Sequence, residues 1–385
     1  MVLRLGFLIL LIAVSAWAQK VEVVEAGPVF FPGVADSNSP IHWVDGMRYV
    51  YNSDGLPIRS EGAELGAMRY ARATYLLESG VAPWWMEATY RDEADGTIYG
   101  WYHYEIYSFC PMDGARYMAV PVIGAVISRD NGRTFRDLGI VLSDGYAPNC
   151  EAKNGFFAGG HGDFTVIVDK EKQNFYFFFS VYGGPANEQG VAVARMAYGD
   201  RAAPAGNVWK YLDDKWESAG IGGRVTPIFT VRTPWESENA DAMWGPSVHY
   251  NRELDEFVML LNHACCTPDW PPEGIYITFN ADLENPKAWG EPERLFDGGG
   301  WYPMAVGLDI GDTDKSAGNR ARFFMGSDSH WELIFRKGQT GVLPMRSRED
   351  GRKHSDVETR RHRSRSFKSE PRNAVTPSAS TPRKR

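Results

Sequence analysis

A two-strand pattern that recurs five times constrains the fold of this chain more than any other feature. Each copy has a short apolar strand, a polar turn, and a second strand that is rich in aromatic residues. The turns include Asp45-Gly46, Asp95-Gly96 and Asn131-Gly132, which are hairpin signals. The first strands lie within 39–46, 86–90, 163–169, 245–250 and 302–307, and the second strands within 49–53, 98–105, 175–182, 257–262 and 322–327.

A third strand follows in three of the copies, at 124–128, 190–194 and 274–278. We expect a fourth strand after it, often carrying an aromatic residue such as Phe135, Trp216 or Trp289. Four-stranded units repeated about a centre are propeller blades, so the pattern predicts an all-β, five-bladed β-propeller. The units average about 63 residues, more than the roughly 40–45 of a compact repeat, so the extra length must lie in loops. Two separate β-sandwich domains are the structural alternative.

The N-terminus reads as a targeting segment. Residues 1–18 combine Arg4, an apolar run at 6–14 and Ala16-Trp17-Ala18, which predicts a cleaved secretory signal peptide. An uncleaved anchor is the alternative. We therefore expect a secreted or periplasmic protein whose mature form is not associated with a membrane.

The C-terminal end differs from the body in composition. Residues 336–385 hold 15 basic and 5 acidic residues and few apolar ones, which predicts a basic disordered tail. Three alternatives exist for this tail. It binds an acidic polymer, it has no role, or the C-terminus of the sequence is misassigned. The propeller body, residues 19–335, holds 25 basic and 44 acidic residues, and this balance argues against a nucleic-acid partner.

One turn carries a recognisable local motif. The segment SRDNGRTF at 128–135 resembles the Asp-box hairpin of sialidases and other propellers. In such a turn Asp130 accepts backbone N–H bonds, Gly132 takes a positive φ and Phe135 packs beneath. The motif predicts a blade hairpin and no chemistry. A sialidase is disfavoured, because there is one such segment, five units rather than six, and no identifiable arginine triad.

In a propeller, the starts of the first strands and the ends of the second strands face one mouth of the central channel. The residues expected there are Asp36, Asn38, Glu87, Asp163, Trp244 and Tyr302 from first strands, and Asp54, His103, Glu105, Tyr182, His263 and Asp328 from second strands. Aromatic faces stack on sugar C–H surfaces, carboxylates bond hydroxyls, and a carboxyl pair can cleave a glycosidic bond. We therefore expect a carbohydrate partner.

These motifs resemble those of the five-bladed propeller glycoside hydrolases, in the arabinanase/β-xylosidase and invertase/levansucrase groups. The resemblance implies that Asp36, in the segment DSNSP, is the base or nucleophile. It also implies that Asp163, which opens the segment DFTVIVD, tunes the acid. The general acid of those families is a Glu in an E-G-P segment, which here reads Trp244-Gly245-Pro246. The Glu is absent.

Glycoside cleavage needs a proton donor for the leaving oxygen. Glu105, Asp241 or Glu87 would have to supply it. Glu105 ranks first, because His103 and nearby aromatic residues would desolvate it and raise its pKa. The structural alternative is that these carboxylates only cap turns and strands.

Further residues are candidates for substrate binding. His161, in the segment GGHGD, would orient a ligand or simply pack. Four tryptophans would serve either as sugar platforms or as packing between blades, and these are Trp84, Trp85, Trp244 and Trp301.

The four cysteines allow three pairings, and export favours a Cys110–Cys150 bond. Cys265 and Cys266 are adjacent, so a bond between them would be strained. No CxxC spacing indicates zinc and no phosphate-binding glycine loop is evident, so we predict no metal or cofactor from the residues. The resemblance alone allows a calcium ion in the channel.

Our first hypothesis is an exported propeller that hydrolyses a glycosidic bond of a poly- or oligosaccharide. The second is a glycan-binding propeller without activity, in which Trp244 has replaced the acid and stacks on a sugar. The third is an interaction scaffold.

Overall fold

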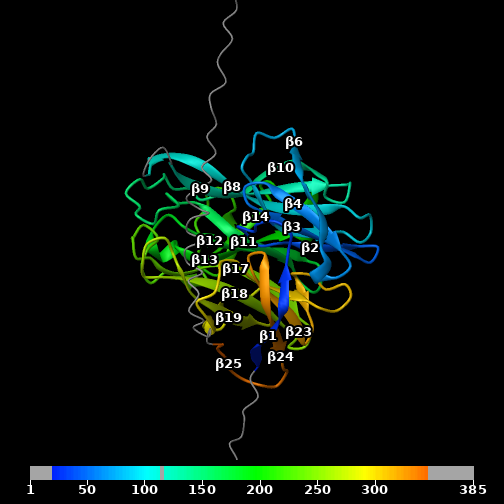
Figure 1. The fold of residues 1–385 in the computed structure, drawn as a ribbon. Helices are drawn as coiled ribbons and strands as arrows, with labels where there is room; N and C mark the ends of the chain where they lie inside the picture. Colours follow the sequence, from blue (N-terminus) through cyan, green and yellow to red (C-terminus); the bar gives the residue numbers. More distant parts are fainter. Residues whose placement is uncertain (1–19, 113–116, 346–385) are drawn as a thin grey trace, which may run out of the picture. The chain divides into compact units, whose positions relative to one another are not determined.

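The computed structural model describes residues 20–112 and 117–345. These residues form five sheets arranged as a five-bladed β-propeller (Figure 1), which confirms the predicted fold class. Within these ranges the only helical elements are four short 3₁₀ turns. No helix in the described part of the chain is long and apolar enough to cross a membrane.

Four of the blades follow one another along the chain. The first blade consists of β2 (Ile41–Val44), β3 (Met47–Ser53), β4 (Pro57–Gly62) and β5 (Arg69–Ala73). The second consists of β7 (Trp85–Arg91), β8 (Ile98–Pro111), β9 (Tyr117–Ser128) and β10 (Thr134–Leu142), with β6 (Tyr75–Leu77) parallel to β10. The third consists of β11 (His161–Val168), β12 (Asn174–Val181), β13 (Gly190–Ala197), β14 (Val208–Leu212) and β15 (Lys215–Ala219), with β16 (Phe229–Thr230) paired to β13. The fourth consists of β17 (Asp241–Asn251), β18 (Glu256–Cys265), β19 (Pro272–Asn280) and β20 (Glu293–Asp297), with β22 (Ser316–Ala317) parallel to β17.

The fifth blade joins the two ends of the described chain. It consists of β21 (Pro303–Gly307), β23 (Arg320–Met325), β24 (Asp328–Phe335), β1 (Val21–Phe30) and β25 (Val342–Leu343). β1 pairs antiparallel with β24, and the dark-blue β1 runs close to the orange β24 in Figure 1. This pairing closes the ring and removes the sheet edge that an open arrangement would expose. The repeat pattern, which starts at residue 39, did not predict β1.

Residues 336–345 belong to this last blade. β25 pairs in parallel with β1, with Val342 opposite Val21, and the backbone N–H of Arg336 donates to the carbonyl of Lys20 at 3.0 Å. The fold therefore runs past the predicted tail boundary at 336, because backbone pairing does not require apolar side chains. The rest of the predicted tail and the predicted signal peptide at 1–18 lie outside the described residues.

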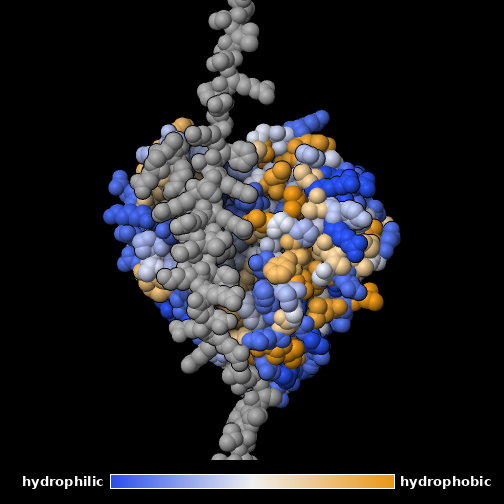
Figure 2. Space-filling model, in the orientation of Figure 1, coloured by the Kyte–Doolittle hydropathy of each residue, from blue (hydrophilic) through white to orange (hydrophobic). Residues whose placement is uncertain are grey.

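Strand β12 shows how neighbouring blades share their cores. Residues 175–179 are all buried. The odd-numbered members pack with Trp101 of the second blade, whereas the even-numbered members pack in a cluster with Trp289 of the fourth. This follows from the alternation of side chains along a strand. On the face seen in Figure 2, hydrophobic residues lie among hydrophilic ones.

The aromatic residues expected on fourth strands have different positions. Phe135 lies on β10 as predicted. Trp216 lies on β15, one strand further out, and Trp289 follows a 3₁₀ turn ahead of β20. The blades vary in their outer strands because those strands are less constrained by the ring.

The turn between β9 and β10 has the contacts predicted for it. Oδ1 of Asp130 accepts hydrogen bonds from the backbone N–H groups of Arg133 and Thr134, both at 3.0 Å. Gly132 has a φ of 70°, and Phe135 is buried. These contacts fix the hairpin of the second blade.

Candidate functional site

Irregularities in the first strands aim side chains at the centre of the propeller. The pairing of β7 with β8 shifts at Glu87, and the pairing of β11 with β12 shifts at Asp163. Asp163 has a φ of 41°, and Tyr302, just before β21, has a φ of 57°. Bulges and positive φ values turn side chains out of the regular alternation and are common next to functional sites. Three blades thereby contribute to one cluster.

Asp163 is the centre of this cluster and is buried. Its Oδ1 accepts a hydrogen bond from the hydroxyl of Tyr302 at 3.0 Å, and its Oδ2 accepts one from the hydroxyl of Tyr182. Burial, and then the charge of Asp163, raise the pKa of both tyrosines well above the usual value. Both hydroxyls therefore stay protonated and keep Asp163 in place.

Glu87 and His103 form a buried pair beside Asp163. Oε1 of Glu87 lies 3.1 Å from Nδ1 of His103, and Oε2 accepts a hydrogen bond from the backbone N–H of Phe164 at 2.9 Å. Burial raises the pKa of Glu87, against the opposing effect of His103. Burial lowers the pKa of His103, but the hydrogen bond to Glu87 and the surrounding carboxylates outweigh it, so the pKa is raised. This direction favours the protonated form of His103.

Two partly exposed carboxyl groups border the buried cluster. Oε1 of Glu105 lies 3.7 Å from Nε2 of His103. Burial raises the pKa of Asp36 well above the usual value, and the charges of Glu105, Asp163 and Asp54 raise it further. Burial also raises the pKa of Glu105, although the neighbouring His103 acts against it. The structure thus brings together three of the four predicted catalytic residues.

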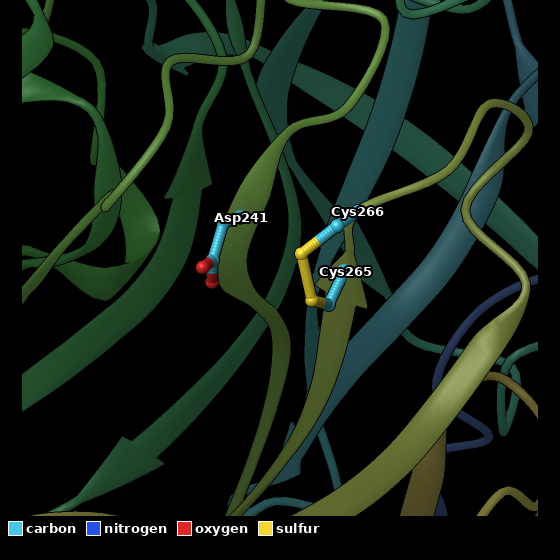
Figure 3. Close-up of side chains that lie close together, drawn as sticks. All are labelled: Asp241, Cys265 and Cys266. Carbon is cyan, nitrogen blue, oxygen red and sulfur yellow. A yellow bond between two sulfur atoms is a disulfide. The ribbon is translucent and has the colours of Figure 1, made fainter.

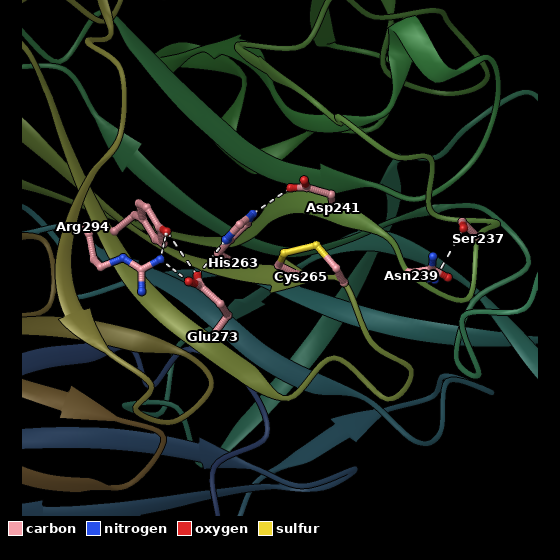
Figure 4. The surroundings of a disulfide bond; sticks show 9 residues. Ser237, Asn239, Asp241, His263, Cys265, Glu273 and Arg294 are labelled. Carbon is pink, nitrogen blue, oxygen red and sulfur yellow. Dashed lines mark hydrogen bonds and ion pairs between the residues drawn. A yellow bond between two sulfur atoms is a disulfide. The ribbon is translucent and has the colours of Figure 1, made fainter. Parts of the chain in front are cut away.

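Asp241, the fourth, interacts with residues of its own blade. Its Oδ1 lies 2.9 Å from Nε2 of His263, and Nδ1 of His263 lies 2.8 Å from Oε2 of Glu273 (Figure 4). Arg294 bonds Glu273 from the other side. This chain of ion pairs holds both Asp241 and His263, the latter a predicted binding residue, and the sequence did not reveal it.

A disulfide between neighbouring residues lies at the same end of the fourth blade. Cys265 is bonded to Cys266, and Asp241 stands opposite Cys265 in the register of β17 and β18 (Figure 3). The second disulfide is Cys110–Cys150, as predicted. It ties the end of β8 to the loop before β11.

Two further predicted binding residues make buried polar contacts, Asn38 between blades and His161 within the third blade. The buried Asn38 donates from Nδ2 to the carbonyl of Phe164 at 2.8 Å and to that of Pro246 at 3.1 Å. Nε2 of the buried His161 lies 2.9 Å from Nζ of Lys210. Burial lowers the pKa of this lysine to about 7. Lys210 was not predicted, because its sequence context gives no sign of burial.

Trp244, which stands where the resemblance places the acid, is buried. Its ring meets those of Trp301 and Tyr302 edge-on, with centroids 5.6 and 5.7 Å apart. The expectation that Trp244 stacks on a sugar does not fit this burial. Trp84 and Trp85 are buried as well, whereas Trp301 is partly exposed and donates from Nε1 to the carbonyl of Trp270 at 3.1 Å.

The cluster does not fit the calcium ion that the resemblance allows. Ligand atoms of Glu87, His103 and Asp163 lie within 4.8 Å of one another. Calcium prefers six to eight oxygen ligands, whereas one of these three groups is a ring nitrogen. The oxygens of Glu87 and Asp163 already bond the protein. The group of Asp241 with Cys265 and Cys266 has its sulfur atoms in a disulfide, so it lacks thiolate ligands.

Solved structures similar to this chain include galactanases and an arabinanase. An exo-beta-1,3-galactanase from Phanerochaete chrysosporium has 13% identity and a TM-score of 0.47, covering 81% of this chain and 64% of its own. A putative exo-beta-1,3-galactanase from Bifidobacterium bifidum has 13% identity and a TM-score of 0.49, covering 84% and 98%. An alpha-L-arabinanase from Cellvibrio cellulosa has 13% identity and a TM-score of 0.46, covering 77% and 91%.

These enzymes are of the propeller glycoside hydrolase class that the sequence resembles. The chain spans 64% of the length of the Phanerochaete enzyme. No protein-family model and no curated protein sequence matches it. At such low identity the substrates of these enzymes do not identify what this protein acts on.

Proposed function

We propose that this protein hydrolyses a glycosidic bond of a poly- or oligosaccharide at the mouth of its channel. The observation that carries the proposal is the pair of partly exposed carboxyl groups, Asp36 and Glu105, with the charge of Glu105 raising the pKa of Asp36. Glycoside hydrolysis needs one protonated and one ionised carboxyl group at the bond. When one of two neighbouring carboxyl groups ionises, the other retains its proton, so such a pair supplies both forms.

We assign the proton to Asp36 in the free protein. Its pKa is raised well above the usual value, whereas the pKa of Glu105 is raised by burial against the opposing effect of His103. Asp36 would then protonate the leaving oxygen, and Glu105 would act as base or nucleophile. The resemblance implies instead that Asp36 is the base or nucleophile, and the surroundings of Glu105 had ranked it first as the acid. Asp163, held by two tyrosine hydroxyls, would act as a positioning residue.

Two substitutions and two kinds of substrate test these roles. Asp36→Asn should lower hydrolysis of oligosaccharides by about 100-fold or more, the usual contribution of a general acid. It should leave cleavage of aryl glycosides, whose leaving groups need no proton, largely intact. Glu105→Gln should impair both. Asp45→Asn, which alters an exposed carboxylate in the turn between β2 and β3, is the matched control and should change neither.

The outcomes distinguish the alternatives. The reverse pattern would restore Asp36 as the base or nucleophile, as the resemblance implies, with Glu105 as the acid. Oligosaccharide hydrolysis that survives both substitutions would refute the pair as the active carboxyls.

Glycan binding without hydrolysis is the second candidate function. It is favoured by the absence of a carboxylate at position 244, where the resemblance places the general acid. Binding of glycans from a panel, with no hydrolysis product, would support this function. If neither binding nor product is detected, the interaction scaffold is the remaining hypothesis.

We also propose that the protein is exported, to the periplasm or beyond the cell. The prediction rests on residues 1–18, and two disulfides suit an oxidising compartment. Cell fractionation with N-terminal sequencing tests it. Recovery from the cytoplasm with Met1 retained would contradict it.

A further inference from the structure

One face of β8 leads outward from the candidate site. Side chains alternate along a strand, so His103, Glu105 and Tyr107 project from the same face, and Phe109 follows where the regular pairing with β9 ends. Their exposure rises along the strand, from 4% at His103 to 64% at Tyr107 and 97% at Phe109. The pairing of β8 with β9 shifts between Tyr107 and Pro111, so Phe109 lies in an irregular part of the strand, next to the buried Ser108. The strand thus runs from a buried polar pair to open aromatic rings.

The partner strand β9 adds a third ring to this face. Ala119 stands opposite Tyr107 and Tyr117 opposite Pro111, so Tyr117 projects on the side of Tyr107. Tyr117 is 49% exposed. We call the three exposed rings of Tyr107, Phe109 and Tyr117 the aromatic track.

The hairpin that carries the aromatic track is anchored on its other face. Cys110 and Met118 are buried, and Cys110 is bonded to Cys150. The backbone N–H of Ala119 donates to the carbonyl of Phe156 at 3.0 Å. The backbone that carries the rings is therefore held in place. Exposure of the rings to water is unfavourable, and a ligand that covers them would remove this unfavourable free energy.

We propose that the aromatic track binds the part of a glycan chain that extends from the carboxyl pair. This inference rests on the proposed carbohydrate function. At about 3.3 Å per residue, the track reaches roughly 13 Å beyond Glu105, so it would contact sugar rings next to the one that reacts. Exposed rings on the two paired strands offer flat apolar faces that suit the C–H faces of sugars.

The charge of the hairpin favours a neutral ligand over an anionic membrane surface. In sequence the hairpin, residues 98–128, carries one basic residue, Arg116, and two acidic ones, Glu105 and Asp113, so it has no basic cluster. Anionic membranes attract basic clusters next to the apolar residues that insert. The continuity of the aromatic track with Glu105 favours a glycan over an unrelated protein partner.

Substitution of the three rings tests the proposal. The triple variant Tyr107→Ala, Phe109→Ala, Tyr117→Ala should raise the KM for long oligosaccharides by about tenfold or more, since each ring contact contributes about 0.5–1.5 kcal/mol. It should leave kcat/KM for an aryl monosaccharide glycoside unchanged. Tyr75→Ala, at 59% exposure on the outer edge of the same blade, is the matched control and should have no effect on either.

The assay separates failure of the track from failure of the proposed hydrolysis. If the wild type hydrolyses long chains and the triple variant does so with the same KM, the track is refuted. If the wild type produces no product, calorimetry with oligosaccharides of increasing length replaces the kinetics, and the triple variant must bind long chains more weakly. Loss of self-association or of vesicle binding in the triple variant, with glycan affinity unchanged, would overturn the proposal.

Discussion

The hydroxyl of Tyr302 donates a hydrogen bond to Oδ1 of Asp163 at 3.0 Å, although 139 positions separate the two residues in the chain. The contact joins the fifth blade to the third at the centre of the ring. The hydrogen bond can form because both residues have positive φ values, which turn their side chains toward each other. The candidate site therefore depends on the closed ring as well as on its own residues.

Removal of this hydroxyl should weaken the fold. Tyr302→Phe leaves a buried carboxylate oxygen of Asp163 without its donor, which costs about 1–3 kcal/mol of unfolding free energy. Urea unfolding measures the loss. The matched control is Tyr75→Phe, which deletes an exposed hydroxyl and should change the unfolding free energy very little. Equal stability of both variants would show that the bond is not formed in solution.

The pH profile of hydrolysis should respond to His103. His103 lowers the pKa of Glu105, so its loss in His103→Gln should raise that pKa. If Glu105 must be ionised, the acidic limb of kcat/KM moves to higher pH, by about one pH unit for the loss of one nearby charge. The exposed His330→Gln is the control. An unmoved acidic limb would contradict the role of Glu105 as the ionised group.

A buried histidine of the fourth blade should make the fold sensitive to acid. Burial lowers the pKa of His249 to about 3, with a smaller effect from Lys315. As the pH falls below 6.5, the unfolded chain binds the proton first, so stability is full above that pH and is lost toward pH 3. The loss is about 1.4 kcal/mol per pH unit.

Substitution of His249 should flatten this acid dependence. His249→Leu removes the titrating group, so its unfolding free energy should fall less than that of the wild type between pH 6.5 and 5, by about 2 kcal/mol. Chemical unfolding at several pH values measures the difference. Parallel curves for the two proteins would mean that His249 titrates normally in the fold.

The closure of the ring by β1 should contribute strongly to stability. Val21 is fully buried and pairs with both β24 and β25. Val21→Asp places an unpaired charge at this junction and should lower the unfolding free energy by about 3 kcal/mol or more. The control is Val34→Asp at a position that is 51% exposed, where little change is expected. Similar unfolding free energies for the two variants would show that the pairing of β1 does not stabilise the closed ring.

Much of the fold could be predicted because its signals are local. The alternation of residues 163–169 and the Asn131-Gly132 turn depend on neighbours in the chain, and they identified the first strands and a blade hairpin. The outer strands were harder. β1 has no hairpin partner beside it in the sequence, and its pairing with β24 exists only once the ring is closed.

The sequence predicted which residues belong to the site better than it predicted their roles. Asp36, Glu105 and Asp163 converge as expected from their places at strand ends, whereas Asp241 pairs with His263. Whether a side chain faces a ligand, a neighbouring blade or an ion-pair partner depends on groups far away in the chain.

By itself, the sequence determined the strand pattern, the number of blades and the acidic, aromatic character of the channel mouth, because strand and turn preferences act over a few residues. Only the tertiary structure decided that Asn38 bridges two blades, that Trp244 is buried and that β1 completes the ring. Those outcomes arise from burial and from hydrogen bonds between distant segments, which exist only when the blades have come together.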